Sequence, residues 1–217
     1  MDLRTSTIIS RIQKSTFFLW FGSVSAVRMS GEKDFPMTKT EIRALEDLKT
    51  WGVNLVADFV KTFSKPTQDH LLEKGYIQIL TSPVGEVFAL GSAGYRHFDY
   101  KFQWYKPTET AVMDQLALRL CVQVMEARGY NQPFWRSRTV ARVVSARGIP
   151  TYLLVKYRDP SASVVKNTVA KLLADGIEDN ASIIIFRNNA HRIQGATKLS
   201  HHPVELETPP WATVWNS

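Results

Sequence analysis

The sequence predicts an α+β protein, with helices and a hairpin in its first half and a small α/β sandwich in its second half. Two patterns support this fold class. Helical periodicity runs from residue 38 to 75 and ends in strand-like alternation, and from residue 107 helical segments alternate with short apolar runs. The 217 residues are 44% hydrophobic and 11% aromatic, which excludes a disordered chain and suffices for a substantial core.

Residues 1–36 form an N-terminal segment in which a charged start precedes the apolar run STFFLWFGSVSAV. We expect an uncleaved amphipathic helix that packs on its own domain or on a second subunit. A targeting segment is the alternative, because Val24-Ser25-Ala26 would suit a signal peptidase, and an over-extended start before Met29 or Met37 is a third. The apolar run is too short to span a bilayer, so a membrane partner is not favoured.

A first domain is predicted over residues 37–106. Thr38 or Thr40 caps its first helix, and Gly52 closes it. The segment VNLVADFVKTF follows, with these positions expected to be buried: Leu55, Val56, Phe59 and Val60. A third helix begins after a Ser64 cap and ends at Gly75.

Two alternating apolar runs around the turn residues Ser82, Pro83 and Gly85 predict a hairpin after the third helix. Three helices and a hairpin are the elements of a winged helix-turn-helix, in which the third helix enters the DNA major groove. The expected DNA contacts are the polar residues on its exposed side and one near the hairpin: Ser64, Lys65, Gln68, Lys74 and Arg96. A winged helix used for protein contact or dimerisation is the alternative.

A second domain is predicted over residues 107–190. A long helix over residues 108–128 precedes the strand-like runs RTVARVVSA and TYLLVKYR, with YNQPFW as a possible additional strand. A helix between Pro160 and Gly176 and the buried strand ASIIIF complete the sandwich. The tail over residues 191–217 is expected to be extended and anchored by Trp211 and Trp215.

Positive charge gathers in the second domain. The formal net charge is +7, and residues 127–158 contain seven Lys or Arg and no Asp or Glu. Such a cluster favours phosphate contacts. Arg136, Arg138 and Arg142 are separated by even numbers of residues on one expected strand, so their side chains should lie on one face of it. The candidate DNA contacts of this domain are Arg136, Arg138, Arg142, Arg147, Lys156 and Arg158. Trp135 is the best candidate for stacking on a base.

The stretches LLEKGYIQILTSPVGEVFALG and YLLVKYRDPSASVVKNTVAKL, with His97 between them, resemble the replication-relaxation family of bacterial plasmid and phage proteins. The resemblance spans roughly residues 38–187. It implies a winged helix followed by a core similar to the PD-(D/E)xK nucleases, which resemble restriction endonucleases. Lys156 takes the place of the motif lysine, but Leu154 stands where a metal-binding carboxylate belongs, so the core resembles a degenerate one.

A non-enzymatic DNA-binding protein is therefore the first functional hypothesis, with duplex DNA as partner in replication, transcription control or DNA maintenance. A divergent nuclease or nicking enzyme is the second, with these candidate catalytic residues: Glu109, Asp114, Asp159 and Lys156. A protein-interaction scaffold is the third, and a homodimer through the N-terminal helix or the tail is possible. We expect no metal and no cofactor, a buried and unreactive Cys121, and a cytoplasmic, nucleoid-associated location.

Overall fold

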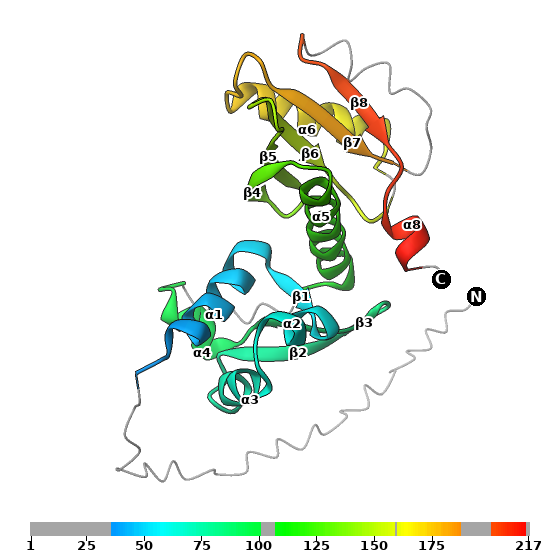
Figure 1. Cartoon of the computed structure of the whole chain (residues 1–217). Helices are drawn as coiled ribbons and strands as arrows, with labels where there is room; N and C mark the ends of the chain where they lie inside the picture. The colour runs from blue at the N-terminus through cyan, green and yellow to red at the C-terminus, as the bar shows by residue number, and fades with distance from the viewer. Residues whose placement is uncertain (1–35, 101–106, 159, 188–200, 216–217) are drawn as a thin grey trace, which may run out of the picture. The chain divides into compact units, whose positions relative to one another are not determined.

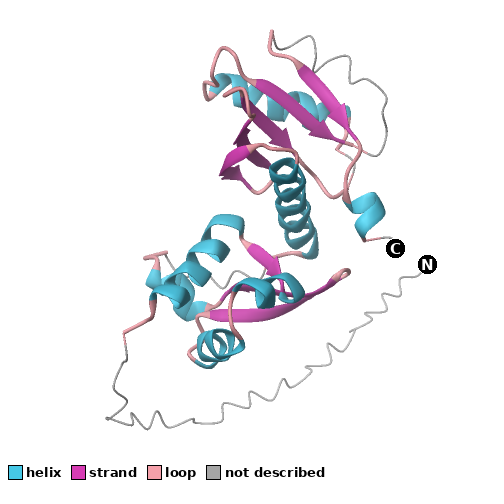
Figure 2. Ribbon diagram, viewed as in Figure 1, coloured by secondary structure: helices cyan, strands magenta, loops and turns pink. Residues whose placement is uncertain are grey.

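The computed structural model describes residues 36–100, 107–158, 160–187 and 201–215 (Figure 1). The fold is mixed α+β, and the described residues contain two β-sheets, as Figure 2 shows. The expectations for the N-terminal segment and for Asp159 lie outside the described residues.

Three helices precede the first hairpin. α1 (Lys39–Trp51), α2 (Val56–Thr62) and α3 (Lys65–Glu73) enclose a core that contains Leu45, Leu48, Phe59 and Leu71. Thr38 caps α1 as predicted, and Gly52 closes it with a φ of 81°, a backbone conformation that glycine adopts without strain.

The first sheet is antiparallel, with the order β1-β3-β2. β2 (Ile77–Ser82) and β3 (Gly85–Leu90) form the predicted hairpin, and their register pairs Ser82 with Gly85 across the turn. β1 (Val53–Leu55) adds a third strand that the sequence pattern did not predict, since its three residues were placed in the apolar segment VNLVADFVKTF. The expectation that Val60 is buried is wrong, because its side chain is 46% exposed. α4 (Ser92–His97) follows β3.

The second sheet has the order β4-β5-β6-β7-β8 and follows the long helix α5 (Glu109–Ala127). Its antiparallel strands are β4 (Asn131–Ser137), β5 (Val140–Val144) and β6 (Pro150–Leu154). β7 (Ser182–Phe186) and β8 (Val204–Glu207) extend it in parallel. α6 (Ala162–Ala174) lies between β6 and β7 in the chain.

Two cores cover the two faces of this sheet. On one face, α5 residues such as Leu118 and Cys121 pack with Leu153 and Ile184. On the other, the α6 residues Val165, Val169 and Leu172 pack with alternate residues of β5, β6 and β7. The sheet is thus sandwiched between α5 and α6, as the alternating helical and strand-like segments predicted.

The strand boundaries differ from the prediction in two places. The run that was expected to hold Arg136, Arg138 and Arg142 on one strand is interrupted by a turn at residues 138–139, so Arg136 lies on β4 and Arg142 on β5. The tail is not merely extended. It contributes β8 to the sheet, and the short helix α8 (Trp211–Val214) buries Trp211 in the α5-side core.

Candidate nucleic-acid interface

Both ends of α3 present polar side chains to solvent. Ser64 and Lys65 at its start and Lys74 at its end are exposed, as expected. Lys65 Nζ, however, lies 2.7 Å from Asp69 Oδ1, so part of its charge is offset. Gln68 was also expected on this side, and that expectation is wrong. Its side chain is buried, and Nε2 donates to the Phe63 carbonyl at 2.6 Å.

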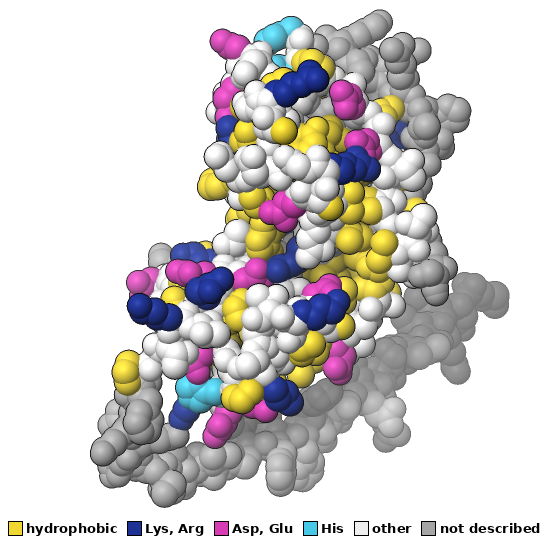
Figure 3. All heavy atoms as spheres, in the orientation of Figure 1, with side chains coloured by type: hydrophobic (Ala, Val, Ile, Leu, Met, Phe, Trp, Pro, Cys, Tyr) yellow, Lys and Arg dark blue, Asp and Glu magenta, His cyan; other side chains and the backbone are white. Residues whose placement is uncertain are grey.

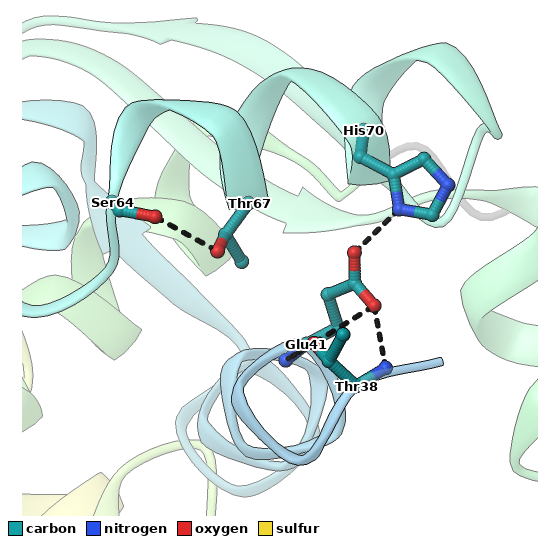
Figure 4. Close-up of polar contacts among 5 residues, drawn as sticks. All are labelled: Thr38, Glu41, Ser64, Thr67 and His70. Atoms are coloured by element: carbon teal, nitrogen blue, oxygen red, sulfur yellow. Dashed lines mark hydrogen bonds and ion pairs between the residues drawn. The ribbon is translucent and has the colours of Figure 1, made fainter. Parts of the chain in front are cut away.

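A polar cluster joins α3 to the start of α1 (Figure 4). The Glu41 carboxylate accepts hydrogen bonds from the Thr38 amide at 2.7 Å and from the Thr38 hydroxyl at 3.0 Å, and it contacts His70 Nδ1 at 2.5 Å. Burial favours the neutral form of Glu41, but the Thr38 amide and His70 outweigh burial, and the pKa of Glu41 is lowered. Glu41 of the α1 capping box thereby also links α1 to α3 through His70.

The charge of this first part of the chain is balanced. Residues 37–100 contain seven Lys or Arg and eight Asp or Glu. Figure 3 shows basic and acidic side chains interspersed over the face that it displays. These residues therefore supply no net positive charge for a sequence-independent attraction to phosphates.

Residues 127–158, called the basic window below, acquire acidic partners from elsewhere in the sequence. Arg128 Nη1 lies 2.6 Å from Glu207 Oε2 of β8, and Arg142 Nη2 lies 2.7 Å from Glu178 Oε1. Arg138 Nε lies 3.7 Å from Asp114 Oδ2 of α5. The window is therefore far less cationic in the folded protein than its sequence indicates.

Arg136 and Arg142 belong to one hydrogen-bonded network around Tyr152. The Tyr152 hydroxyl donates to Glu178 Oε2 at 2.7 Å and accepts from Arg136 Nη1 at 3.2 Å, while Arg142 Nε donates to Glu178 Oε1 at 2.8 Å. Burial and the bond to Glu178 raise the pKa of Tyr152. Burial opposes ionisation of Glu178 too, but the hydrogen bonds from Tyr152 and Arg142 prevail and lower its pKa.

Four cations of the window have no ion-pair partner in the part of the chain that the structure describes: Arg136, Arg147, Lys156 and Arg158. Arg147 is exposed in the turn between β5 and β6. Lys156 is half-buried and Arg158 is exposed, and both lie in the segment that joins β6 to α6. Arg96, at the end of α4, is likewise exposed.

The candidate catalytic residues that the structure describes form no metal site, and Asp159 lies outside the described residues. Leu154 is buried in the α6-side core, and Glu109 is exposed in the first turn of α5. Asp114 is buried, and its Oδ1 accepts the Tyr157 amide at 3.1 Å. Within the described ranges no three His, Cys, Asp or Glu side chains are grouped as metal ligands. Cys121 is fully buried, and burial raises the pKa of its thiol.

The aromatic residue available for stacking is not the one that the sequence favoured. Trp135 is half-buried against the α5-side core, whereas its neighbour Phe134 is 61% exposed. The sequence signal that could have identified Phe134 is its position two residues before Arg136, because alternate residues of a strand lie on the same face.

The chain was also compared with known proteins. It matches no protein-family model, and no curated protein and no solved structure matches it. The likeness to the replication-relaxation family therefore rests on the quoted sequence stretches alone. Among the described residues, no helix has both the length and the apolar character needed to cross a membrane.

Proposed function

We propose that this protein binds duplex DNA without cleaving it. In this proposal the three helices and the β2–β3 hairpin act as a winged helix, and the segment between β6 and α6 adds phosphate contacts. The second sheet with α5 and α6 then serves as a nuclease-like core that has lost its catalytic acids, and the protein acts at the nucleoid in replication, transcription control or DNA maintenance.

The first support is the connection between α2 and α3. Only Phe63 and Ser64 separate the two helices, and α3 begins with exposed polar side chains. A short turn of this kind is typical of helix-turn-helix proteins, in which the N-terminal residues of the second helix contact base edges. Because residues 37–100 carry nearly equal numbers of basic and acidic side chains, they are better suited to contacting bases and fixing orientation on DNA than to attracting phosphates strongly.

The observation that carries the proposal is the contrast within the basic window. Arg128, Arg138 and Arg142 face carboxylates, but Lys156 and Arg158 have no such partner among the described residues. Asp114 holds the backbone of the same segment through the Tyr157 amide, which limits the freedom of the residues on either side. Cations on a held segment lose less entropy when they bind a phosphate.

The Lys156→Ala/Arg158→Ala double variant tests this proposal. We expect weaker binding to a fluorescent duplex and a slope of log K against log salt that is shallower by about two, one unit for each lost phosphate contact. Lys166→Ala/Lys171→Ala removes two exposed cations from α6, outside the proposed DNA contacts, and serves as the control. Fluorescence anisotropy at several salt concentrations without Mg²⁺ provides the measurement.

Equal losses in the two double variants would contradict the assigned phosphate contacts. An absence of duplex binding at low salt would contradict the proposal as a whole, as would Mg²⁺-dependent cleavage that Asp114→Asn abolishes.

A further inference from the structure

The outer part of the second sheet leaves an aromatic ring in solvent. Phe134 of β4 is 61% exposed, more than any other large hydrophobic side chain in the described residues. A phenyl ring that is exposed to this extent forgoes part of the free energy that burial would contribute.

Phe134 shares its face of the sheet with arginines. The register pairs Phe134 with Arg142 and Arg142 with Tyr152, and Arg136 lies two residues beyond Phe134 on β4. This is the face that α6 covers over β6 and β7, where Tyr152 and Ile183 are buried. Over β4 the same face carries the exposed Phe134 and Arg136.

Arg136 supplies the positive charge on this face. Arg136 is bonded to a neutral hydroxyl, and its guanidinium lies 5.6 Å from the centre of the Tyr152 ring. Arg136 therefore has no ion-pair partner among the described residues, while its side chain is held in place. Arg142 is offset by Glu178, so Arg136 is the cation beside Phe134 that can contact a phosphate.

Pairing with another strand is disfavoured at this edge. Pro133 lacks an amide hydrogen, Gln132 has a φ of 49°, and the register of β4 against β5 shifts twice. Proline and such irregularities block the addition of a further strand at an edge. An occupant of this face would accordingly use side-chain contacts rather than backbone pairing.

We infer that the face defined by Phe134, Arg136 and Arg142 binds single-stranded DNA, with an unpaired base stacked on Phe134 and the adjoining phosphate on Arg136. Aromatic rings beside cations are the usual means of binding single strands, whereas the bases of a duplex are stacked on one another and offer no free face. This inference rests on the proposed function and extends it to a second form of DNA.

Phe134→Ala tests the stacking contact. We expect binding to a single-stranded oligothymidine to weaken roughly ten-fold, which is within the range for one lost base stack, and duplex binding to stay unchanged. Phe134→Trp should restore single-strand binding, and it should quench the fluorescence of a 2-aminopurine placed in the oligonucleotide. Val214→Ala, which trims a half-exposed apolar side chain on α8, is the control.

The outcomes separate this inference from the proposed function. If Phe134→Ala leaves single-strand binding unchanged, or weakens duplex binding equally, the inference fails, and the role of Lys156 and Arg158 in duplex binding is unaffected. If duplex binding is absent but single-strand binding depends on Phe134, the inference stands and the proposed function fails. A concentration-dependent dimer that Phe134→Ala abolishes would instead assign the face to a second copy of the chain.

Discussion

Arg142 has no acidic residue near it in the sequence, yet a carboxylate oxygen of Glu178 lies 2.7 Å from its guanidinium in the fold. The two residues are brought together because β5 and β6 are adjacent and the Tyr152 hydroxyl holds the same carboxylate. Composition within a window cannot reveal such a partner, since neutralisation depends on tertiary contacts. The cationic character inferred from residues 127–158 was therefore too high.

Gln68 shows a second limit at the scale of single residues. Helical periodicity placed it among the polar positions of α3, but its amide satisfies the Phe63 carbonyl inside the protein. A polar residue can be buried when a backbone group needs a partner there, and the sequence pattern does not indicate which backbone groups do.

Glu178→Gln should destabilise the protein by about 1 kcal/mol at pH 7, a value reduced from that of a buried charged hydrogen bond because Glu178 is partly exposed. The pKa of Glu178 in the folded protein is lowered from its ordinary value of 4.5. Its ionised form therefore stabilises the fold fully above about pH 4.5, and this contribution is lost as the pH falls through the folded-state pKa.

Urea denaturation of wild type and Glu178→Gln between pH 3 and pH 7 measures this difference. The gap between the two free energies of unfolding should close at the acidic end. Asp179→Asn, which changes the exposed neighbouring residue, should show no comparable gap. A gap for Glu178→Gln that is independent of pH would contradict the assigned ion pair.

At the scale of elements, local chemistry predicted most of the helices and strands. The Thr38 cap, the Gly52 and Gly75 stops and the turn at Pro83 each acted as the sequence indicated. Such signals are readable because cap and turn preferences arise from nearby backbone geometry.

The strands that the sequence did not reveal depend on distant partners. β1 is three residues long and exists because it pairs with β3, and β8 exists because it pairs with β7. β1 is too short to show an alternating pattern, and β8 alternates over four residues only, the minimum that marks a strand in a sequence. The same holds for the candidate site, where Lys156 and Arg158 were identified from charge. That neither is paired with a carboxylate among the described residues emerged only from the fold.

Gly91→Ala should destabilise the protein by about 2 kcal/mol, as overpacking typically does. Gly91 lies between β3 and α4, and a Cβ atom there would lie 2.4 Å from the Gly75 carbonyl oxygen. That carbonyl belongs to the backbone that follows α3, so it cannot move without shifting the start of the hairpin. Thermal and urea unfolding should detect the loss, while Ser92→Ala at the next, exposed position should leave stability nearly unchanged.

At the scale of the molecule, α5 belongs to two cores. Its first turns contribute Val112, Met113 and Leu116 to the cluster that contains Val87 of β3, and its later turns contribute Leu118 and Cys121 to the core of the second sheet. Arg119 of α5 adds a two-pronged ion pair with Asp47 of α1, at 2.8 and 3.0 Å. The described parts on either side of residues 101–106 are thereby connected by packing and by charge.

Trp211→Ala should cost about 3–5 kcal/mol in the free energy of unfolding, because the side chain is buried and its removal leaves a large cavity. Trp211 packs in the α5-side core and lies near the rings of Tyr157 and Trp215. Val214→Ala, in the same short helix but 52% exposed, is the matched control and should change stability by less than about 0.5 kcal/mol. Equal effects of the two substitutions in urea unfolding would contradict the anchoring role of Trp211.

The charge pairing of the basic window exists only in the native state. In the denatured chain, Asp114, Glu178 and Glu207 no longer lie near Arg138, Arg142 and Arg128, so residues 127–158 present seven cations with no carboxylate among them. A polyanion that bound this window in the denatured chain would therefore lower the population of the native state, because a ligand that prefers the unfolded chain opposes folding. The residues involved would be the ones whose ion pairs form only in the fold.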